Sequence, residues 1–351
     1  MGYSSEMNKA TGNRYNIIDL LKGICCFAVV MLHFPAKISH EFLILQAMLG
    51  RCAVPIFILL SGYLLGLKVQ PEFSKSLRQA RKLFVWSIAM ELISLVFKSI
   101  YGAAVYGDSI FALADEVSIQ RLVHLLIFNR PFFVGLVWYL YAAAYATIVF
   151  AVFLRWGKTK ILLYISPILL LAYYVFGRYS EPIFGTEAPS WLASNWLLIA
   201  LPMYTIGYYI AKTDFSKIKV VNLKIVMGIS VFLLYVEAST FFELVGGGRN
   251  NYVGNLVLSV LVILCFVKPQ VCVKDNILIT IGKRYSLYIY LFQFIARDLV
   301  QLVKLKTVNF EYFNILLSKT LPFAIFTVSF LIALLVYKVV DCRKKCMVAE
   351  L

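Results

Sequence analysis

The stretch DLLKGICCFAVVMLHF, residues 19–34, is nearly all apolar yet contains one aspartate, one lysine and one histidine. A helix that crosses the hydrocarbon of a bilayer needs roughly 20 apolar residues, so this stretch and its flanks are long enough to span it. A charge placed in hydrocarbon costs at least about 2.5 kcal/mol. Asp19, Lys22 and His33 are therefore expected to face protein or water, which indicates a polar path inside a bundle of helices.

Helix geometry places these three side chains on one face. Lys22 and His33 are eleven residues apart, which is three helical turns plus roughly 20°, and about 16 Å along the axis. Asp19 comes one turn before Lys22 and can form an ion pair with it. We expect Lys22 near the cytosolic side of the membrane and His33 at the outer end.

The rest of the 351-residue chain is equally apolar, with 61% hydrophobic residues, whereas soluble domains are closer to half. About ten apolar blocks are long enough to span a membrane: 17–34, 46–66, 83–105, 132–154, 161–177, 191–211, 225–245, 252–268, 277–296 and 320–340. These blocks predict an all-α integral membrane protein, a bundle of about ten transmembrane helices. We expect one membrane domain over residues 1–351.

The formal net charge of +16 could indicate a nucleic-acid partner. However, with the N-terminus inside, the inner segments contain about twice as many lysines and arginines as the outer ones, as the positive-inside rule requires. This bias fits ten spans with both termini in the cytoplasm. The basic excess is therefore an orientation signal, and we expect a lipid bilayer and no nucleic acid as the partner.

The second apolar block contains GRCAVPIFILLSGYLLG from Gly50. Because it descends from the outer side, Arg51 is expected at the same depth as His33. Ser61 and Gly62 lie deeper, where small residues usually permit close helix packing.

A basic cluster follows on the first inner segment, with Arg78 and Arg81 one helical turn apart and Lys82 beside them. Clustered guanidinium and ammonium groups suit a polyphosphate ligand. The same residues can also serve only as orientation signals, as inner basic residues usually do.

Several other features of the sequence leave more than one role open or indicate no function. Glu91 falls within a span, where a buried acid is either functional or held by hydrogen bonds between helices. Ser109 lies in a GDSI block typical of serine esterases, but no Asp-x-x-His follows, so we assign it no role. The three histidines lack metal-ligand spacing, so no metal is expected. The glycines at 246–248 indicate a turn.

Five motifs occur in one order along the chain: Asp19, Lys22 and then His33 after ten intervening residues; VPIFILLSGYLL from Val54; Arg78 and Arg81; VWYLYA from Val137; and IGKRYSLYIYL from Ile281. In this order and spacing the chain resembles the acyltransferase-3 family of integral membrane acyltransferases. The resemblance is strongest to the membrane domain of vancomycin-resistance serine racemases and to surface-polysaccharide O-acetyltransferases. Neither the racemase domain nor the extracytoplasmic esterase domain of some relatives is expected here.

Two positions depart from the family pattern. Relatives often have a histidine where this chain has Gln293, so a second histidine is absent there. Lys22 replaces the commoner arginine, which keeps the charge but loses bidentate geometry.

The resemblance implies a multi-pass enzyme of the bacterial plasma membrane. It would move an acyl group, most often acetyl, from cytosolic acetyl-CoA (acyl-CoA) to a hydroxyl of an extracytoplasmic cell-wall or surface glycan. Arg78, Arg81, Lys82 and Lys22 would hold the donor.

At the outer end, the resemblance implies that His33 acts on the acceptor hydroxyl. His33 would be the general base or would carry the acyl group itself. Trp138 and Tyr139 would contact the substrate. Arg51 or Tyr139 could stabilise the developing oxyanion, and Asp19 either takes part directly or only neutralises Lys22.

Two other classes of function remain open from the residues themselves. A transporter or flippase of a small molecule or lipid-linked glycan would also have a polar path, but it would often show inverted repeats and broken spans. A scaffold or sensor that kept the fold would have no need of His33 and Lys22.

Overall fold

The computed structural model describes residues 2–107, 117–215, 219–244, 251–266, 273–307 and 309–349; within these, the side chains of residues 2–15, 190, 193, 220, 241–244 and 343–349 are left aside. No strand occurs in this part of the chain, and nearly all of it is helical. The all-α prediction is therefore confirmed. Ser109 and the turn expected at residues 246–248 lie outside the described residues.

Within the described ranges, seven helical segments are long and apolar enough to cross a membrane: Asn16–His33, His40–Gly66, Phe73–Tyr106, Gly135–Arg155, Val221–Thr240, Ile277–Lys306 and Leu321–Cys342. They belong to helices α1 (Gly2–His33), α2 (His40–Gly66), α3 (Phe73–Tyr106), η2 with α5 (Gly135–Val137 and Trp138–Arg155), α10 (Val220–Leu244), α12 to α13 (Ile277–Lys306) and α15 (Leu321–Ala349). The chain is thus a multi-pass membrane protein.

The other three expected spans form shorter elements. Helix α6 (Thr159–Val175) has 17 residues and α11 (Val253–Phe266) has 14. Between them, the block at 191–211 divides into α8 (Ser190–Ala193), the π-helix η3 (Trp196–Ala200) and α9 (Leu201–Lys212). A 14-residue helix is only about 21 Å long, less than the roughly 30 Å of hydrocarbon. The count of ten spans and the side on which the termini lie therefore stay predictions.

The chain divides into two compact units. The first unit comprises Met1–Val54, Ile218–Ser239 and Val257–Leu351, and the second comprises Pro55–Lys217 and Thr240–Leu256. Helix α2 begins in the first unit and ends in the second.

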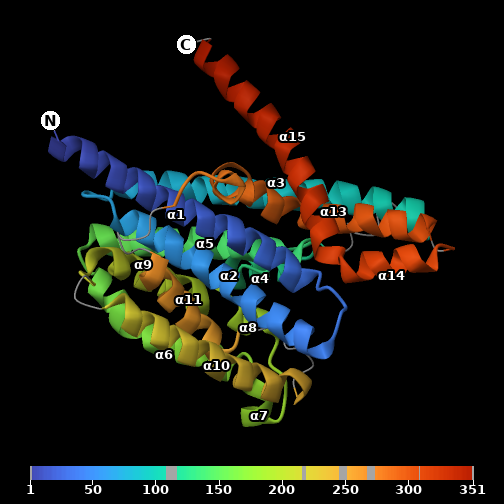
Figure 1. Ribbon diagram of the computed structural model, residues 1–351, viewed down its shortest axis with the longest axis horizontal. Helices are drawn as coiled ribbons and strands as arrows, with labels where there is room; N and C mark the ends of the chain where they lie inside the picture. Colours follow the sequence, from blue (N-terminus) through green and yellow to red (C-terminus); the bar gives the residue numbers. More distant parts are fainter. Residues whose placement is uncertain are drawn as a thin grey trace. The chain divides into compact units, whose positions relative to one another are not determined.

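In the first unit, α1 packs against the two short elements α12 (Ile277–Thr280) and η4 (Ile281–Tyr285) that lead into α13 (Ser286–Lys306). Helix α13 in turn packs along α15, and the short α14 (Glu311–Lys319) joins them (Figure 1). Aromatic side chains fill these contacts; the rings of Tyr285 and Tyr337, for example, lie 5.2 Å apart. Segments more than 250 residues apart in sequence are thereby brought together.

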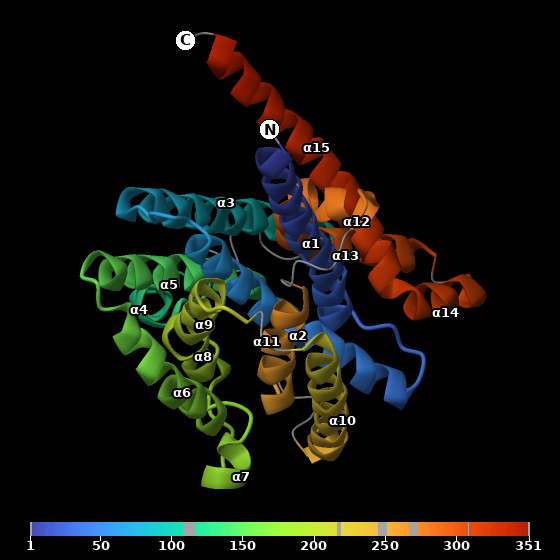
Figure 2. The same ribbon diagram turned by 60° about the vertical axis from the view of Figure 1, so that its left-hand side comes forward.

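In the second unit, α3 packs along α5, and α6 packs against α9 and η3 (Figure 2). Glycines allow the end of α2 to approach α9 very closely. A Cβ atom added to Gly62 would lie 1.9 Å from the Tyr204 carbonyl oxygen, and one added to Gly207 would lie 2.1 Å from that of Leu59. The prediction that Gly62 permits close helix packing is therefore confirmed.

Candidate active site

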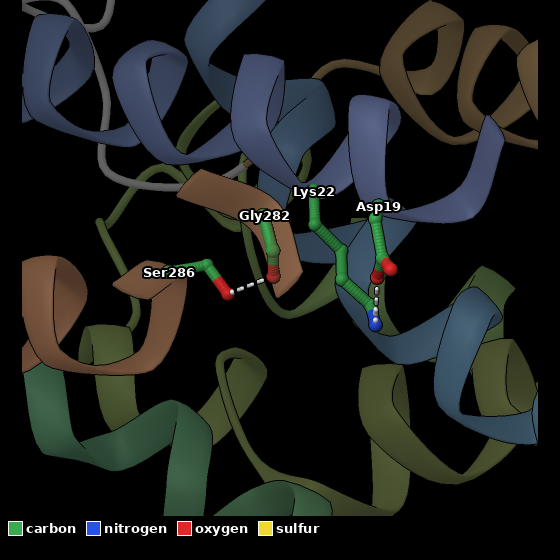
Figure 3. Close-up of polar contacts among 4 residues, drawn as sticks. All are labelled: Asp19, Lys22, Gly282 and Ser286. Atoms are coloured by element: carbon green, nitrogen blue, oxygen red, sulfur yellow. Dashed lines mark hydrogen bonds and ion pairs between the residues drawn. The ribbon is translucent and has the colours of Figure 1, made fainter. Parts of the chain in front are cut away.

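Asp19 and Lys22 form the ion pair that their spacing predicts. The Lys22 Nζ lies 3.1 Å from the Asp19 Oδ1, and the two side chains extend from the same side of α1 (Figure 3). The Lys22 side chain is 26% exposed and the Asp19 side chain 13%, so the ion pair is largely shielded from solvent. Because each charge has an opposite partner, the helix can carry both within a segment long enough to span the membrane.

The Gly-x-x-x-Ser motif near the end of the chain meets this ion pair from η4. A Cβ atom on Gly282 would lie 1.7 Å from the backbone carbonyl oxygen of Asp19, so only glycine fits there. The Ser286 hydroxyl donates a hydrogen bond of 2.8 Å to the Gly282 carbonyl (Figure 3). Because Gly282 lies in the π-helical segment η4, the hydrogen bond from Ser286 gives the Gly282 carbonyl a partner where η4 meets α1.

The approach of α1 and η4 has glycines on both sides. A Cβ atom on Gly23 would lie 2.3 Å from the carbonyl oxygen of Leu278 in α12. Nearby, the Cys26 thiol donates a 3.4 Å hydrogen bond to the Ser286 carbonyl. Two of the five motifs, from opposite ends of the chain, therefore form one backbone-to-backbone contact that positions Asp19 and Lys22.

His33 is the last residue of α1, and its side chain is exposed. Its ring centroid lies 6.1 Å from that of Phe294 on α13, and the Phe294 ring lies 5.3 Å from that of Phe34. The imidazole is thus held against an aromatic surface while it remains accessible to a ligand.

Arg51 reaches the same end of α1 from α2. Its side chain is 8% exposed, and its guanidinium is close enough to act electrostatically on the His33 imidazole. The preceding residue explains the approach, because a Cβ atom on Gly50 would lie 2.6 Å from the Leu32 Cβ and 2.9 Å from the Ala28 carbonyl oxygen. Arg51 and His33 therefore lie at the same end of α1, as their expected depths require.

Gln46 holds the turn that follows His33, and the sequence interpretation missed it. Its Oε1 accepts a 2.8 Å hydrogen bond from the Ala36 backbone N–H, and its Nε2 donates one of 3.0 Å to the Ala36 carbonyl. The side chain is 1% exposed. The only signal was a glutamine in an otherwise apolar block, which does not reveal its partner.

Gln293 lies on α13 one residue before Phe294 and is fully buried. Its Nε2 donates a 2.9 Å hydrogen bond to the Tyr290 carbonyl of its own helix. This hydrogen bond lies within α13, to the carbonyl three residues earlier.

The basic cluster lies in the second unit. Arg78, Arg81 and Lys82 are exposed on α3, at positions that share one helical face. Before them, Lys75 donates a 2.6 Å hydrogen bond to Glu72, and this bond lowers the pKa of the Glu72 carboxyl. The Arg78 guanidinium also acts electrostatically on the Glu72 carboxyl, so this pair borders the basic cluster.

Trp138 and Tyr139 begin α5 in the same unit and are half-buried. The Tyr139 ring lies 6.2 Å from that of Phe57 on α2. The Trp138 carbonyl accepts a 3.2 Å hydrogen bond from Asn129 Nδ2, which ties the start of α5 to the end of α4 (Ile119–Phe128).

Glu91 has a structural partner for its carboxylate. Its two oxygens each accept a 2.9 Å hydrogen bond, from the backbone N–H groups of Phe132 and Phe133. Lys98 donates to the Phe133 carbonyl at 2.5 Å. Glu91 therefore anchors the segment before α5, which favours the hydrogen-bonding interpretation over a catalytic one.

The predicted site residues thus fall into two sets, one in each unit. Asp19, Lys22, His33 and Arg51 are organised around α1, and the basic cluster with Trp138 and Tyr139 is organised around α3 and α5. Among the described residues, no group of three His, Cys, Asp or Glu could hold a metal ion.

The family model described as an acyltransferase domain matches residues 15–338, nearly the whole chain and every motif above. The chain belongs to the acyltransferase-3 family. It is therefore a membrane acyltransferase. A search of curated proteins gave no match to this acyltransferase, and neither did a search of solved structures.

Proposed function

We propose that this acyltransferase moves an acetyl group from cytosolic acetyl-CoA to a hydroxyl of an extracytoplasmic cell-wall or surface polysaccharide, in a bacterial plasma membrane. The observation that carries the proposal is the polar face of α1. It presents a paired ammonium at Lys22 and an accessible imidazole at His33, about 16 Å further along the same helix. One helix therefore carries Lys22 at the depth of a donor that enters from one side. It carries His33 at the depth of an acceptor that enters from the other side.

On the donor side, the diphosphate of coenzyme A would bind Arg78, Arg81 and Lys82. These side chains are exposed and share one face of α3, so several charge-assisted hydrogen bonds can form at once. Lys22 would contact the extended arm of the donor, with Asp19 holding the ammonium in place.

At the other end of α1, neutral His33 would accept the proton of the acceptor hydroxyl as its oxygen attacks the thioester carbon. The C–S bond then breaks, and the coenzyme leaves as a thiol after taking up a proton. General-base catalysis of this kind contributes about 10²–10⁴ in rate. The Arg51 guanidinium would stabilise the oxyanion of the tetrahedral intermediate, because it already acts on the imidazole. Tyr139 remains the alternative oxyanion donor.

A covalent route uses the same residues. His33 would first attack the thioester and carry the acetyl group, and the acceptor hydroxyl would then displace it. The two routes differ in whether label stays on the protein when no acceptor is present.

The carrier hypothesis gains no specific support from the helices. The π-helical segment Ile281–Tyr285 continues directly into α13, so it is not a break between two half-helices. Trp196–Ala200 continues into α9, and the interruption before it separates only the four-residue helix α8. Broken spans that present helix termini to a substrate are the feature that a carrier would often need.

The test uses the full chain in proteoliposomes with labelled acetyl-CoA, and follows thiol release and label in the glycan. We expect His33→Gln to lower transfer by about 10²–10⁴. His40→Gln, an exposed histidine at the start of α2, serves as the matched control and should transfer normally. Undiminished glycan labelling by His33→Gln would overturn the role of His33, and uptake of intact substrate without thiol release would favour the carrier.

A further inference from the structure

A cavity of about 510 Å³ lies in the first unit, where the segment after α1 meets the end of α13 and the helix α14. None of the five family motifs contributes to it. Most of its surface is apolar, with Leu305 and Ile315 among the lining residues, and its charged groups come from Lys37, Lys304, Glu311 and Lys319.

The charge of this pocket is positive. Three lysines from three different segments line it, against a single carboxylate from Glu311, so two positive charges remain uncompensated. Gln301, Asn314 and Ser318 add neutral hydrogen-bonding groups. Ammonium groups that converge with neutral donors fit a compact anion with several acceptor oxygens, and a phosphate group has these properties.

Hydrogen bonds organise the wall of the pocket. Ser318 donates a 2.8 Å hydrogen bond to the Asn314 carbonyl and lies 3.5 Å from the Lys304 Nζ, which donates to its hydroxyl. Asn314 Nδ2 donates a 2.7 Å hydrogen bond to the Thr307 carbonyl. The Lys37 backbone N–H donates to the Ser318 carbonyl at 3.4 Å. The pocket is therefore tied to the chain segment that begins at His33.

Helix α14 is amphipathic, and its two faces point to a membrane interface. Glu311, Asn314 and Ser318 line the pocket at helical spacing. On the other side of the helix, Tyr312 and Leu316 are 91% and 60% exposed. The polar face of α14 carries one acidic and one basic residue, Glu311 and Lys319, and an exposed apolar face beside a polar one is typical of a helix that lies at the headgroup level of a bilayer.

The pocket lies along α13 from His33. Phe294, whose ring contacts the imidazole, and Gln301, which lines the pocket, are seven residues apart. They therefore share a face of α13 and are separated by about 10 Å along its axis. Arg297 lies between them, with its guanidinium 5.1 Å from the Phe294 ring centroid. A phosphate in the pocket and a hydroxyl at His33 can thus belong to one molecule.

We propose that the pocket of Lys37, Lys304 and Lys319 binds a phosphate group on the acceptor side, so that the acceptor of this enzyme is phosphate-bearing. The inference rests on the function proposed above. The phosphate could belong to the glycan itself or to a lipid headgroup that carries it, and both sources present the same chemistry to the lysines.

The binding test uses the full chain in neutral detergent, without acyl donor, and inorganic phosphate as the probe in calorimetric titration. We expect Lys304→Gln with Lys319→Gln to weaken phosphate binding by about tenfold or more, because two charge-assisted contacts are lost. Lys219→Gln with Lys224→Gln makes the same charge change at exposed positions outside the pocket and should leave binding unchanged. Equal binding by both double variants, or none by the parent chain, would overturn the proposal.

A second arm identifies the source of the phosphate. Vesicles of phosphatidylcholine, with and without phosphatidylglycerol, replace the soluble probe. If the parent chain binds vesicles with phosphatidylglycerol more tightly than vesicles without it, and the Lys304→Gln, Lys319→Gln variant does not, the ligand of the pocket is a lipid headgroup. Inorganic phosphate binding that phosphatidylglycerol does not compete for supports the pocket with a phosphate of the glycan.

The transfer assay separates this inference from the proposed function. Thiol release from acetyl-CoA at a saturating concentration of acceptor reports acyl transfer itself, so its absence in the parent chain would count against the proposed function and leave the binding test intact. With one oligosaccharide in phosphorylated and dephosphorylated forms, we expect KM for the phosphorylated form to rise about tenfold in the Lys304→Gln, Lys319→Gln variant, with kcat unchanged. Equal KM for the two forms in the parent chain would contradict a phosphate-bearing acceptor.

Discussion

Replacing Gly282 by alanine tests the contact that joins the two ends of the chain. The added Cβ would lie 1.7 Å from the Asp19 carbonyl oxygen, 2.7 Å from the Asp19 carbonyl carbon and 2.8 Å from the Gly23 nitrogen. Ordinary van der Waals contact begins at 3.4 Å. Helix α1 and η4 would therefore have to separate by about 1.7 Å, and no side chain can rotate away because all three atoms are backbone.

The magnitude follows from two opposing effects. Overpacking a well-packed contact costs about 1–3 kcal/mol, and a clash with rigid backbone belongs at the upper end. A helical alanine is intrinsically favoured over glycine by about 1 kcal/mol. The net destabilisation should be about 2 kcal/mol, which for a chain of 351 residues is a fall of about 3 °C in the unfolding midpoint. Since Asp19 moves with the contact, acyl transfer should also decrease.

A thiol-reactive dye followed during heating is the suitable assay, because Cys25 and Cys26 of α1 are only 3% and 2% exposed. All five tryptophans lie in the second unit, so their fluorescence would not report this contact. Gly228→Ala on α10 is the matched control, because its Cβ would meet no described atom within 4 Å. If Gly282→Ala and Gly228→Ala melt at the same temperature, the packing argument is wrong.

Two further substitutions test single polar residues. Glu91→Ala removes the acceptor of two backbone hydrogen bonds from Phe132 and Phe133, so we expect a loss of about 3 kcal/mol, measured by tryptophan fluorescence during heating, whereas Glu91→Gln should lose less. An unchanged unfolding midpoint in Glu91→Ala would show that these hydrogen bonds do not stabilise the fold, and a functional role for Glu91 would again have to be considered. Gln46→Leu leaves the Ala36 N–H without its partner and removes one of the two donors to the Ala36 carbonyl, which keeps the Ile38 N–H, so it should cost about 1–3 kcal/mol and lower acyl transfer. Full transfer activity in Gln46→Leu would show that the turn after His33 does not position the imidazole.

Much of the fold follows from local pattern. Apolar blocks of the right length predict membrane helices, and seven of the expected blocks form helices long enough to span. The block at 191–211 is divided in the structure, because the Asn195 side chain caps the π-helix that begins at Trp196. Hydropathy measures how apolar a segment is, and it does not measure where its hydrogen-bonded helix begins.

In the candidate site too, local pattern predicts some contacts and not others. Helix periodicity alone predicts the pairing of Lys22 with Asp19, because both residues lie on one helix and one turn apart. It does not predict that Gln46 holds the turn after His33. A buried glutamine has several possible partners, and only the packed chain selects one of them.

By itself, the sequence determined the helices, the family and the set of polar residues on α1, because all of these depend on short-range spacing. Only the tertiary structure decided that Gly282 packs against the Asp19 carbonyl, and that lysines from three segments line one pocket. The physical reason is the range of the interactions. Periodicity acts over a few residues, whereas a contact between positions 19 and 282 exists only after distant helices have packed and excluded every larger side chain from the space between them.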